Sequence, residues 1–351
     1  MNRKYRPAII VAAVIILAAL GLQLGGIVLA QAEPQLTSQY TSEALPLTDP
    51  QASFWERVPV AALPLTAQAG VPPTLPERSV PAVRVRSANN GEWLSFLVEW
   101  DDATNNAFAT KPDEFRDAMA LQFPVDSTTP GVCMGMRGKP VNLWHWKADW
   151  QSDIDNGFRD VVDAYPNFWK DYYPFAIGTP PYRMPTSFAG DARTYLAGWA
   201  AGNPLSDPAR VTPVEELAAM GFGTATNRVQ QSVIGRGVWQ DGRWRVVVSR
   251  QLTNVDLSSV QFSTRRQAFV AFAVWNGSNS EVGGRKQISS DMAFIIEEAP
   301  REATAPRPAP TPGPGMPWWA LLLISLGGAA IVSLGMVFLY LLRMARRTGG
   351  A

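Results

Sequence analysis

Cysteine and histidine are almost absent from this chain of 351 residues, which contains only Cys133 and His145. A single cysteine cannot form a disulfide within the chain, and it cannot supply a cysteine zinc site, an iron–sulfur cluster or covalent haem attachment. A single histidine excludes a bis-histidine haem and a histidine-rich metal site, and it offers only one base to a catalytic triad. The composition therefore argues against an enzyme with its own metal site or activated nucleophile.

An excess of charge of either sign is also lacking. The 31 lysine and arginine residues nearly balance the 30 aspartate and glutamate residues, so the formal net charge is +1. Such a chain has no overall positive field to hold a polyanion, and we expect no nucleic-acid partner. Hydrophobic residues make up 46% of the chain and charged residues 17%, which is typical of a globular or membrane-anchored protein rather than a disordered one.

The N-terminal segment is apolar. No charged residue occurs in residues 7–32, which follow a basic start. This order is typical of an export signal, and the sequence Ala-Gln-Ala at 30–32 suits a signal peptidase, although the run is also long enough to span a bilayer. Residues 1–32 are therefore either a cleaved signal peptide or a retained N-terminal signal anchor.

A second uncharged segment, residues 318–342, is long enough to cross a ~30 Å hydrocarbon core as a helix. Trp318 and Trp319 begin the segment and arginines follow it at once, as is typical of an interfacial anchor and a cytoplasmic end. We therefore predict a transmembrane helix at 318–342, a basic cytoplasmic tail at 343–351, and a main domain on the extracytoplasmic, or periplasmic, side of the cell membrane. The proline-rich residues 300–317 predict an extended linker.

The body of the chain, residues 81–299, consists mostly of strand patterns. Runs of β-branched and aromatic residues occur between turn sequences such as Asn89-Asn90-Gly91 and Asp241-Gly242. Turns at this frequency predict a mainly β fold, an antiparallel β-sandwich with short helices. Residues 33–80 predict an irregular lead-in to this domain.

Two helices are predicted within the body, at 154–165 and 214–220. The second is indicated by Thr212-Pro213, which has the form of an N-cap followed by a first-turn proline. Long connections rich in glycine, proline and aromatic residues, at 128–150 and 165–203, are expected to carry a site.

Blocks of sequence in the body occur in the order and form of one known family. They are residues 84–88 (RVRSA), 96–102 (FLVEWDD), 115–124 (FRDAMALQFP), 133–136 (CMGM), 140–150 (PVNLWHWKADW), 198–204 (GWAAGNP), 235–250 (GRGVWQDGRWRVVVSR) and 272–289 (FAVWNGSNSEVGGRKQIS). Together these blocks resemble the haem-binding gamma subunit of ethylbenzene dehydrogenase and its relatives. The relatives include the haem subunits of dimethylsulfide dehydrogenase, selenate reductase and chlorate reductase. The resemblance covers about residues 81–298.

The resemblance implies a β-sandwich that holds one non-covalent haem b between an axial methionine and an axial lysine. It also implies electron transfer without catalysis by this subunit. The implied partners are a molybdenum-containing catalytic subunit, an iron–sulfur subunit, and a membrane electron carrier or cytochrome c. The best-known gamma subunits of the family are soluble, whereas this sequence predicts a C-terminal membrane helix, so its set of partners can differ.

The resemblance assigns the axial methionine to Met134, which precedes Gly135, and the axial lysine to Lys286 in the GGRKQIS block. Met136 is an alternative ligand, because residues two apart in an extended segment point the same way. A polarizable thioether and a neutral amine suit a haem iron, which requires Lys286 to lose its proton on burial and iron binding. Without the family motif, this methionine would be interpreted as packing and this lysine as a solvated turn residue.

Further pocket residues are assigned by position. Trp144 and Trp146 share one face of an extended segment, where they form either a flat wall against the haem or part of the sandwich core. Arg285 and Lys147 are candidates to pair with haem propionates, since carboxylates at a pocket rim favour arginine. For Lys147, a solvated position on the surface is as good an interpretation as pairing with a propionate. His145 lies in a family block to which no ligand is assigned.

A haem with both axial positions filled by protein has no open site for oxygen or substrate, so it passes single electrons. The sequence therefore predicts a membrane-tethered b-type cytochrome subunit. It would relay electrons between a periplasmic molybdenum oxidoreductase of the DMSO reductase family and the respiratory chain. Two alternatives remain open. One is a haem-free β-sandwich that binds a carbohydrate or another ligand, and the other is a structural subunit that anchors a respiratory complex to the membrane.

Overall fold

The computed structural model describes residues 35–126, 134–159, 161–165, 167, 197–262 and 267–300. The chain divides into two units, Met1–Ala299 and Pro300–Ala351, and the description below concerns the first unit. The predicted signal or anchor at 1–32, the linker beyond its first residue, the membrane helix at 318–342 and the tail at 343–351 lie outside the described residues. Within the described ranges, no helix is both long enough and apolar enough to cross a membrane.

Strands account for most of the regular structure. They are β1 (Gln35–Tyr40), β2 (Ala61–Pro64), β3 (Thr66–Ala67), β4 (Ala82–Asn89), β5 (Trp93–Asp101), β6 (Ala118–Pro124), β7 (Val141–Lys147), β8 (Val214–Ala219), β9 (Thr226–Asn227), β10 (Ile234–Gln240), β11 (Arg243–Gln251), β12 (Gln267–Trp275), β13 (Gln287–Ile288) and β14 (Met292–Ile296). The helices are short: η2 (Ser53–Arg57), α2 (Ala148–Asn156), α3 (Val161–Ala164), α4 (Ala197–Ala200), η4 (Pro204–Ser206) and η5 (Gly277–Asn279).

The strands follow one hydrogen-bonded path in the order β10-β11-β5-β4-β1-β14-β12-β6-β7-β8-β9, with β2, β3 and β13 paired beside it. β1 forms the corner of this path, because residues 35–38 pair with β14 whereas Gln39 and Tyr40 pair with β4. Both of these pairings are parallel, which is possible because long stretches of chain separate β1 from each neighbour. The sheet is therefore mixed, and the prediction of a purely antiparallel arrangement is corrected at this strand.

Three short stretches of the lead-in at 33–80 take part in the sheet, so this segment is irregular only between them. It contributes β1, β2 and β3, and β3 pairs with β13 through Ala67 and Gln287. The chain that precedes the predicted body thus reaches the strand that directly follows Lys286.

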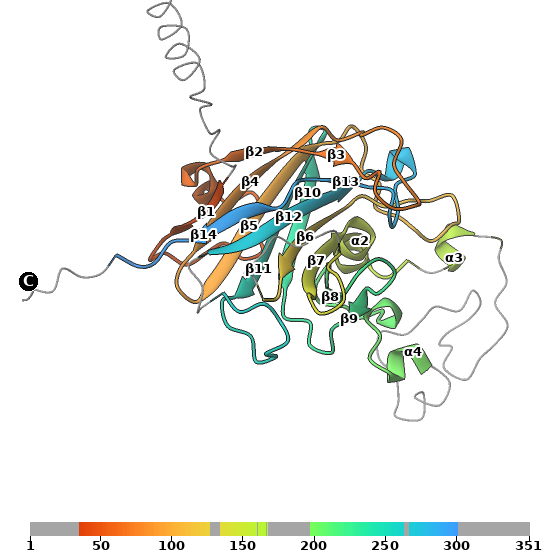
Figure 1. The fold of residues 1–351 in the computed structure, drawn as a ribbon. Coiled ribbons are helices and arrows are strands. Elements are labelled where there is room, and N and C mark those ends of the chain that lie inside the picture. The colour runs from red at the N-terminus through yellow and green to blue at the C-terminus, as the bar shows by residue number, and fades with distance from the viewer. Residues whose placement is uncertain are drawn as a thin grey trace, which may run out of the picture. The chain divides into compact units, whose positions relative to one another are not determined.

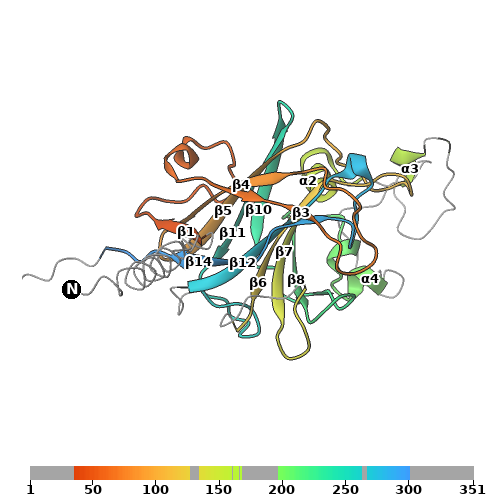
Figure 2. The same ribbon diagram turned by 45° about the horizontal axis from the view of Figure 1, so that its top comes forward.

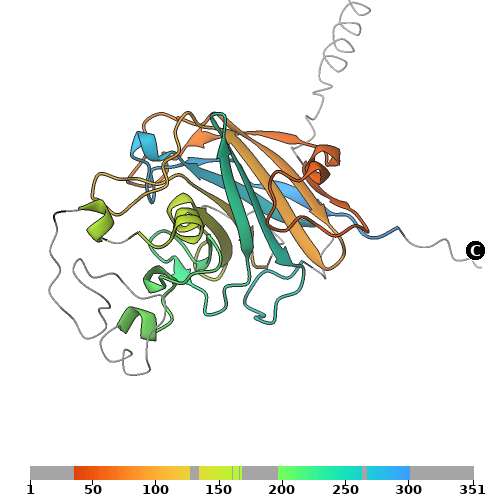
Figure 3. The ribbon, with the colours of Figure 1, turned by 180° about the vertical axis from the view of Figure 1, so that it is seen from behind.

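Two layers of strands pack face to face (Figure 1). The layer of β10, β11, β5 and β4 faces the viewer in Figure 3, and β12, β6, β7 and β8 lie side by side in the other layer (Figure 2). Alternate side chains of both layers meet in one core. Phe96 of β5 contacts Phe123 of β6 and Phe294 of β14, with ring centroids 5.8 and 5.0 Å apart. The mainly β prediction is confirmed, and the layering is consistent with a sandwich.

Both predicted helices differ from the structure. Residues 214–220 were expected to be helical, but residues 214–219 form β8, which pairs with β7 and is buried on both faces, so tertiary context outweighs the local helix signal. The helix predicted at 154–165 is interrupted. α2 ends at Asn156, Gly157 follows with a φ of 90°, and α3 begins at Val161. Glycine tolerates a positive φ, so it ends the first helix.

Candidate functional site

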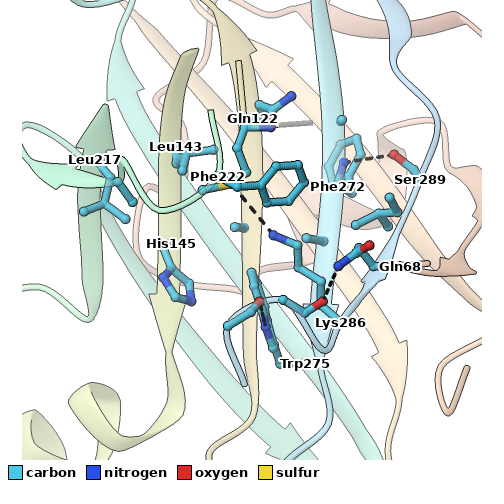
Figure 4. Close-up of a pocket in the computed structure, with 18 of the residues that line it drawn as sticks. Gln68, Gln122, Leu143, His145, Leu217, Phe222, Phe272, Trp275, Lys286 and Ser289 are labelled. Atoms are coloured by element: carbon cyan, nitrogen blue, oxygen red, sulfur yellow. Dashed lines mark hydrogen bonds between the residues drawn. The ribbon is translucent and has the colours of Figure 1, made fainter. Parts of the chain in front are cut away.

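A cavity of about 330 Å³ lies on the outer face of β12, β6, β7 and β8 (Figure 4). Along these strands, the residues that alternate with core side chains point outward. Small side chains occupy the middle of this face: Ala120 of β6 lies opposite Ala273 of β12, and Ala271 lies opposite Gln122. Leucines from β7 and β8 continue the surface. The result is a mostly apolar depression with a floor of alanines.

Two side chains meet across this cavity. Lys286 Nζ lies 3.8 Å from Met134 Sδ, and both residues line the cavity. Lys286 is only 9% exposed. Met136 is 42% exposed, pairs with Lys139 in a turn, and lies outside the cavity lining formed by the described residues. The structure therefore brings Met134 and Lys286 together and leaves Met136 apart.

Backbone contacts hold Met134 in an unusual conformation. Its φ is 60°, in the left-handed region that residues with a Cβ seldom adopt. The Met134 amide donates to Gln122 Oε1 at 2.9 Å, and its carbonyl accepts from the amide of Gly221 at 2.8 Å. A Cβ on Gly135 would lie 2.8 Å from the carbonyl oxygen of Lys139, so glycine is required there. Backbone strain of this kind persists where surrounding structure enforces it and clusters at functional sites.

A glutamine from the lead-in holds the lysine turn. The Gln68 amide donates to the carbonyl of Lys286 at 2.9 Å, and Gln68 Nε2 donates to the carbonyl of Gly284 at 2.9 Å. Lys286 Nζ also lies 5.1 Å from the ring centroid of Trp275. No sequence motif pointed to Gln68, because its role depends on the pairing of β3 with β13, which joins residues more than two hundred positions apart.

Trp144, His145 and Trp146 divide between the two faces of β7. Both tryptophans are fully buried between the layers, and Trp144 lies 4.7 Å from Phe123 between ring centroids. Of the two alternatives, the structure therefore places these tryptophans in the core rather than against the cavity. His145 points the opposite way and lines the cavity, with its ring centroid 4.9 Å from that of Trp275 (Figure 4).

His145 is electrically neutral in the folded protein near pH 7. Burial, followed by the positive charges of Lys147, Arg116 and Lys286, holds its pKa well below the ordinary value of 6.5. Its Nε2 atom is buried and has no hydrogen-bond partner within the described part of the chain. Such an atom is costly to leave unpaired, so it marks a place where a ligand could bind.

The two cations considered for propionate pairing lie outside the cavity lining that the described residues form. Lys147 is 2% exposed, forms an ion pair with Glu215, and lies 4.0 Å from the ring centroid of Trp150. Burial lowers the pKa of Lys147 to about 8, although the charge of Glu215 opposes this shift. Arg285 precedes Lys286, and its Nε atom is buried with no hydrogen-bond partner among the described residues. The charge of Lys147 is therefore balanced by the carboxylate of Glu215 inside the protein.

The described structure is thus a mainly β fold in which an amine and a thioether face each other across an apolar cavity. Residues 52–287 match the family model described as ethylbenzene dehydrogenase. The match covers more than half of the chain, so the chain belongs to this family, and the resemblance drawn from its sequence blocks is confirmed.

Three relatives share about a quarter of their residues with this chain. The protein named "Putative respiratory nitrate reductase heme subunit ORF7" of Haloferax mediterranei is 28% identical, over 88% of this chain and 80% of its own length. The chlorate reductase subunit gamma of Ideonella dechloratans is 25% identical, over 69% of this chain and 76% of its own. The dimethylsulfide dehydrogenase subunit gamma of Rhodovulum sulfidophilum is 24% identical, over 76% of this chain and 78% of its own length.

Among solved structures, a family 9 carbohydrate binding module from Caldicellulosiruptor kristjanssonii in complex with glucose is similar over 78% of this chain and 100% of its own. The sequence identity is 8% and the TM-score is 0.36. This likeness is too distant to support the haem-free alternative.

Proposed function

We propose that this chain is the haem-binding electron-transfer subunit of an exported molybdenum oxidoreductase complex. The relatives are named as heme or gamma subunits of two reductases and a dehydrogenase, which supports an electron-transfer subunit rather than a catalytic one. The single observation that carries the proposal is the meeting of Met134 Sδ and Lys286 Nζ across the cavity.

The residues of the cavity fit a haem. Met134 and Lys286 would hold the haem iron through a thioether and an amine. Both side chains are long and unbranched, so they can part around a flat ligand, and the alanine floor leaves room for its edge. The buried, unpaired Nε2 atom of His145 offers a polar contact. Because Cys133 alone cannot attach a haem covalently, the cofactor proposed is one non-covalent haem b per chain.

A haem held between two protein ligands supplies one-electron transfer, because no coordination position is left for oxygen or substrate. Met134 would favour a high reduction potential, since thioether ligation raises it. Lys286 would bind as a neutral amine, because an ammonium group has no lone pair to give to iron. Leu143, Leu217 and Phe222 line the cavity and would exclude water from the ring.

The proposed partners are a molybdenum-containing catalytic subunit, an iron–sulfur subunit, and a membrane electron carrier or cytochrome c. The apolar segments at 1–32 and 318–342 support export and a tether to the cell membrane, with the described unit on the extracytoplasmic side. A tether of this kind would keep the haem close to carriers that move in the bilayer.

The test is an optical spectrum of the full chain produced with haem supplied, recorded oxidised and then reduced with dithionite. We expect low-spin b-type bands in the wild type. Met134→Ala and Lys286→Ala should each turn the haem high-spin or lose it, because each removes one proposed ligand. Met136→Ala is the matched control and should keep the wild-type spectrum, since Met136 lies outside the described cavity lining.

Two results would contradict the proposal. If the wild type takes up no haem under conditions in which a known b cytochrome does, the proposed haem site is wrong. If only Met136→Ala loses the low-spin bands, the sulfur ligand is two residues from the one proposed.

A further inference from the structure

We propose that His145 donates a hydrogen bond from Nε2 to a carboxylate of the cofactor and so sets how the cofactor sits in the cavity. This inference rests on the proposed function and concerns a haem propionate as the carboxylate. His145 is then a positioning residue for the cofactor, not a ligand of its iron.

The position of His145 is suited to this contact. It points into the cavity from β7, while Lys286 enters from the turn before β13 (Figure 4). Its Nε2 atom is buried and finds no partner among the residues that the structure describes. Buried polar atoms in folded proteins nearly always have a partner, which a ligand in this cavity would supply.

The orientation of the ring is set by its neighbours. His145 stacks on Trp275 at 4.9 Å between centroids with a tilt of 33°. Trp275 is held in turn, because its Nε1 atom donates to the carbonyl of Gly283 at 3.1 Å. A ring fixed in this way loses little freedom when it binds, which makes a single hydrogen bond from it more effective.

The charged side chains near His145 are paired with one another: Lys147 with Glu215, and Arg116 with Asp149. The neighbouring carboxylate, Glu215, already accepts from Lys147, and its Oε2 atom lies 3.9 Å from His145 Nδ1, beyond hydrogen-bonding distance. Among the residues that the structure describes, no hydrogen bond at Nδ1 fixes the tautomer, so Nε2 can carry the proton and donate it to a carboxylate.

The experiment compares two probes, haem and haem dimethyl ester, titrated into the full chain freed of haem. The two share iron and ring, and they differ in that the ester carries its two propionates as neutral methyl esters. The wild type should bind haem at least about tenfold more tightly than the ester, the scale of a hydrogen bond to a charged group. His145→Phe should bind the ester as the wild type does and lose most of the preference for haem. His145→Gln retains an N–H donor and should recover part of that preference.

Trp144→Phe is the matched control, because it changes the same strand on the face turned away from the cavity. It should leave the ratio of the two affinities unchanged. Binding of the ester by each variant also shows that its cavity has folded. The reduced spectrum of the bound ester should stay low-spin, since both axial ligands remain.

Three outcomes would overturn the inference. If the wild type binds haem and ester equally, no carboxylate contact exists. If His145→Phe weakens both probes by the same factor, His145 only packs against the ring. If neither probe binds the wild type, the proposed function itself fails, which is distinct from the first two outcomes because no low-spin spectrum forms at all.

Discussion

Lys286 Nζ and Met134 Sδ lie 3.8 Å apart, although 152 residues separate them in the chain. Each of the two residues is held by a glutamine from another part of the sheet. Gln122 on β6 accepts from the Met134 amide, and Gln68 next to β3 binds the backbone of the lysine turn. The spacing of the two proposed ligands is therefore set by hydrogen bonds outside the pair, and those bonds can be tested.

Gln122→Leu should loosen Met134. The substitution removes the acceptor of a hydrogen bond that holds a residue at φ 60°, so we expect a loss of about 1 kcal/mol in the free energy of unfolding. In the haem-loaded protein, part of the low-spin signal should become high-spin. Urea unfolding and optical spectra measure the two effects. Gln122→Glu keeps an acceptor and should restore the spectrum; a fully low-spin Gln122→Leu protein would show that Met134 needs no such support.

Gln68→Leu should disturb the lysine side of the site. Gln68 is 2% exposed, and its Nε2 atom donates to the carbonyls of Val71 and Gly284. Leaving buried carbonyls unpaired costs about 1–3 kcal/mol each, so the urea midpoint should fall clearly. The control is Gln51→Leu, which changes an exposed glutamine and should leave the midpoint within error. Equal midpoints for the two variants would contradict this role of Gln68.

Ala120→Leu should block haem uptake without unfolding the protein. Ala120 lies on the cavity floor opposite Ala273, so a larger side chain extends into the cavity and not into the core between the layers. We expect haem absorbance to be lost, while the free energy of unfolding changes by less than about 1 kcal/mol. Ala62→Leu, on the exposed side of β2, is the control and should load normally. Full loading of Ala120→Leu would place the ring elsewhere.

The buried ion pair of Lys147 and Glu215 should matter for stability and not for the cofactor. Lys147→Met leaves the carboxylate of Glu215 buried without its cation, which typically costs about 3–5 kcal/mol. Replacing both residues, as Lys147→Met with Glu215→Leu, should recover much of this loss in urea unfolding. The preference for haem over its dimethyl ester should survive in the double variant. Loss of that preference would make Lys147 a carboxylate partner after all.

Stability should fall as pH rises from about 5 to 7, in part through Asp117. Burial, together with the charge of Asp102, raises the pKa of Asp117 from 3.8 to about 7. In this window the folded protein holds a proton that the unfolded chain has released, so the free energy of unfolding decreases with pH, by at most about 1.4 kcal/mol per pH unit. Asp117→Asn should flatten this slope in urea unfolding followed across pH.

The control for this prediction is Asp101→Asn. Hydrogen bonds from Arg84 and Arg243 lower the pKa of Asp101 to about 2, so it does not titrate in the same window. Its pH profile should run parallel to that of the wild type. Parallel profiles for the wild type and Asp117→Asn would show that Asp117 titrates normally.

Local pattern predicted several strands with accuracy. The turn sequences Asn89-Asn90-Gly91 and Asp241-Gly242 connect β4 to β5 and β10 to β11, as expected, because alternation and flanking turns are properties of neighbouring residues. The helix predicted at 214–220 was wrong for the opposite reason. Its proline and threonine resemble a helix start, but pairing with β7 decides its conformation, and that partner lies far away in sequence.

The family and the two candidate iron ligands followed from short motifs, since a motif is a run of neighbouring residues that is matched without knowledge of the fold. Other parts of the site depended on the layering of the sheet. Along β7, alternation shows that Trp144 and Trp146 face one way and His145 the other, but only the second layer determines which face is core. Two further features join residues that are distant in sequence: β1 pairs with β14, and Gln68 hydrogen-bonds to the lysine turn. Packing and not local sequence therefore decides both.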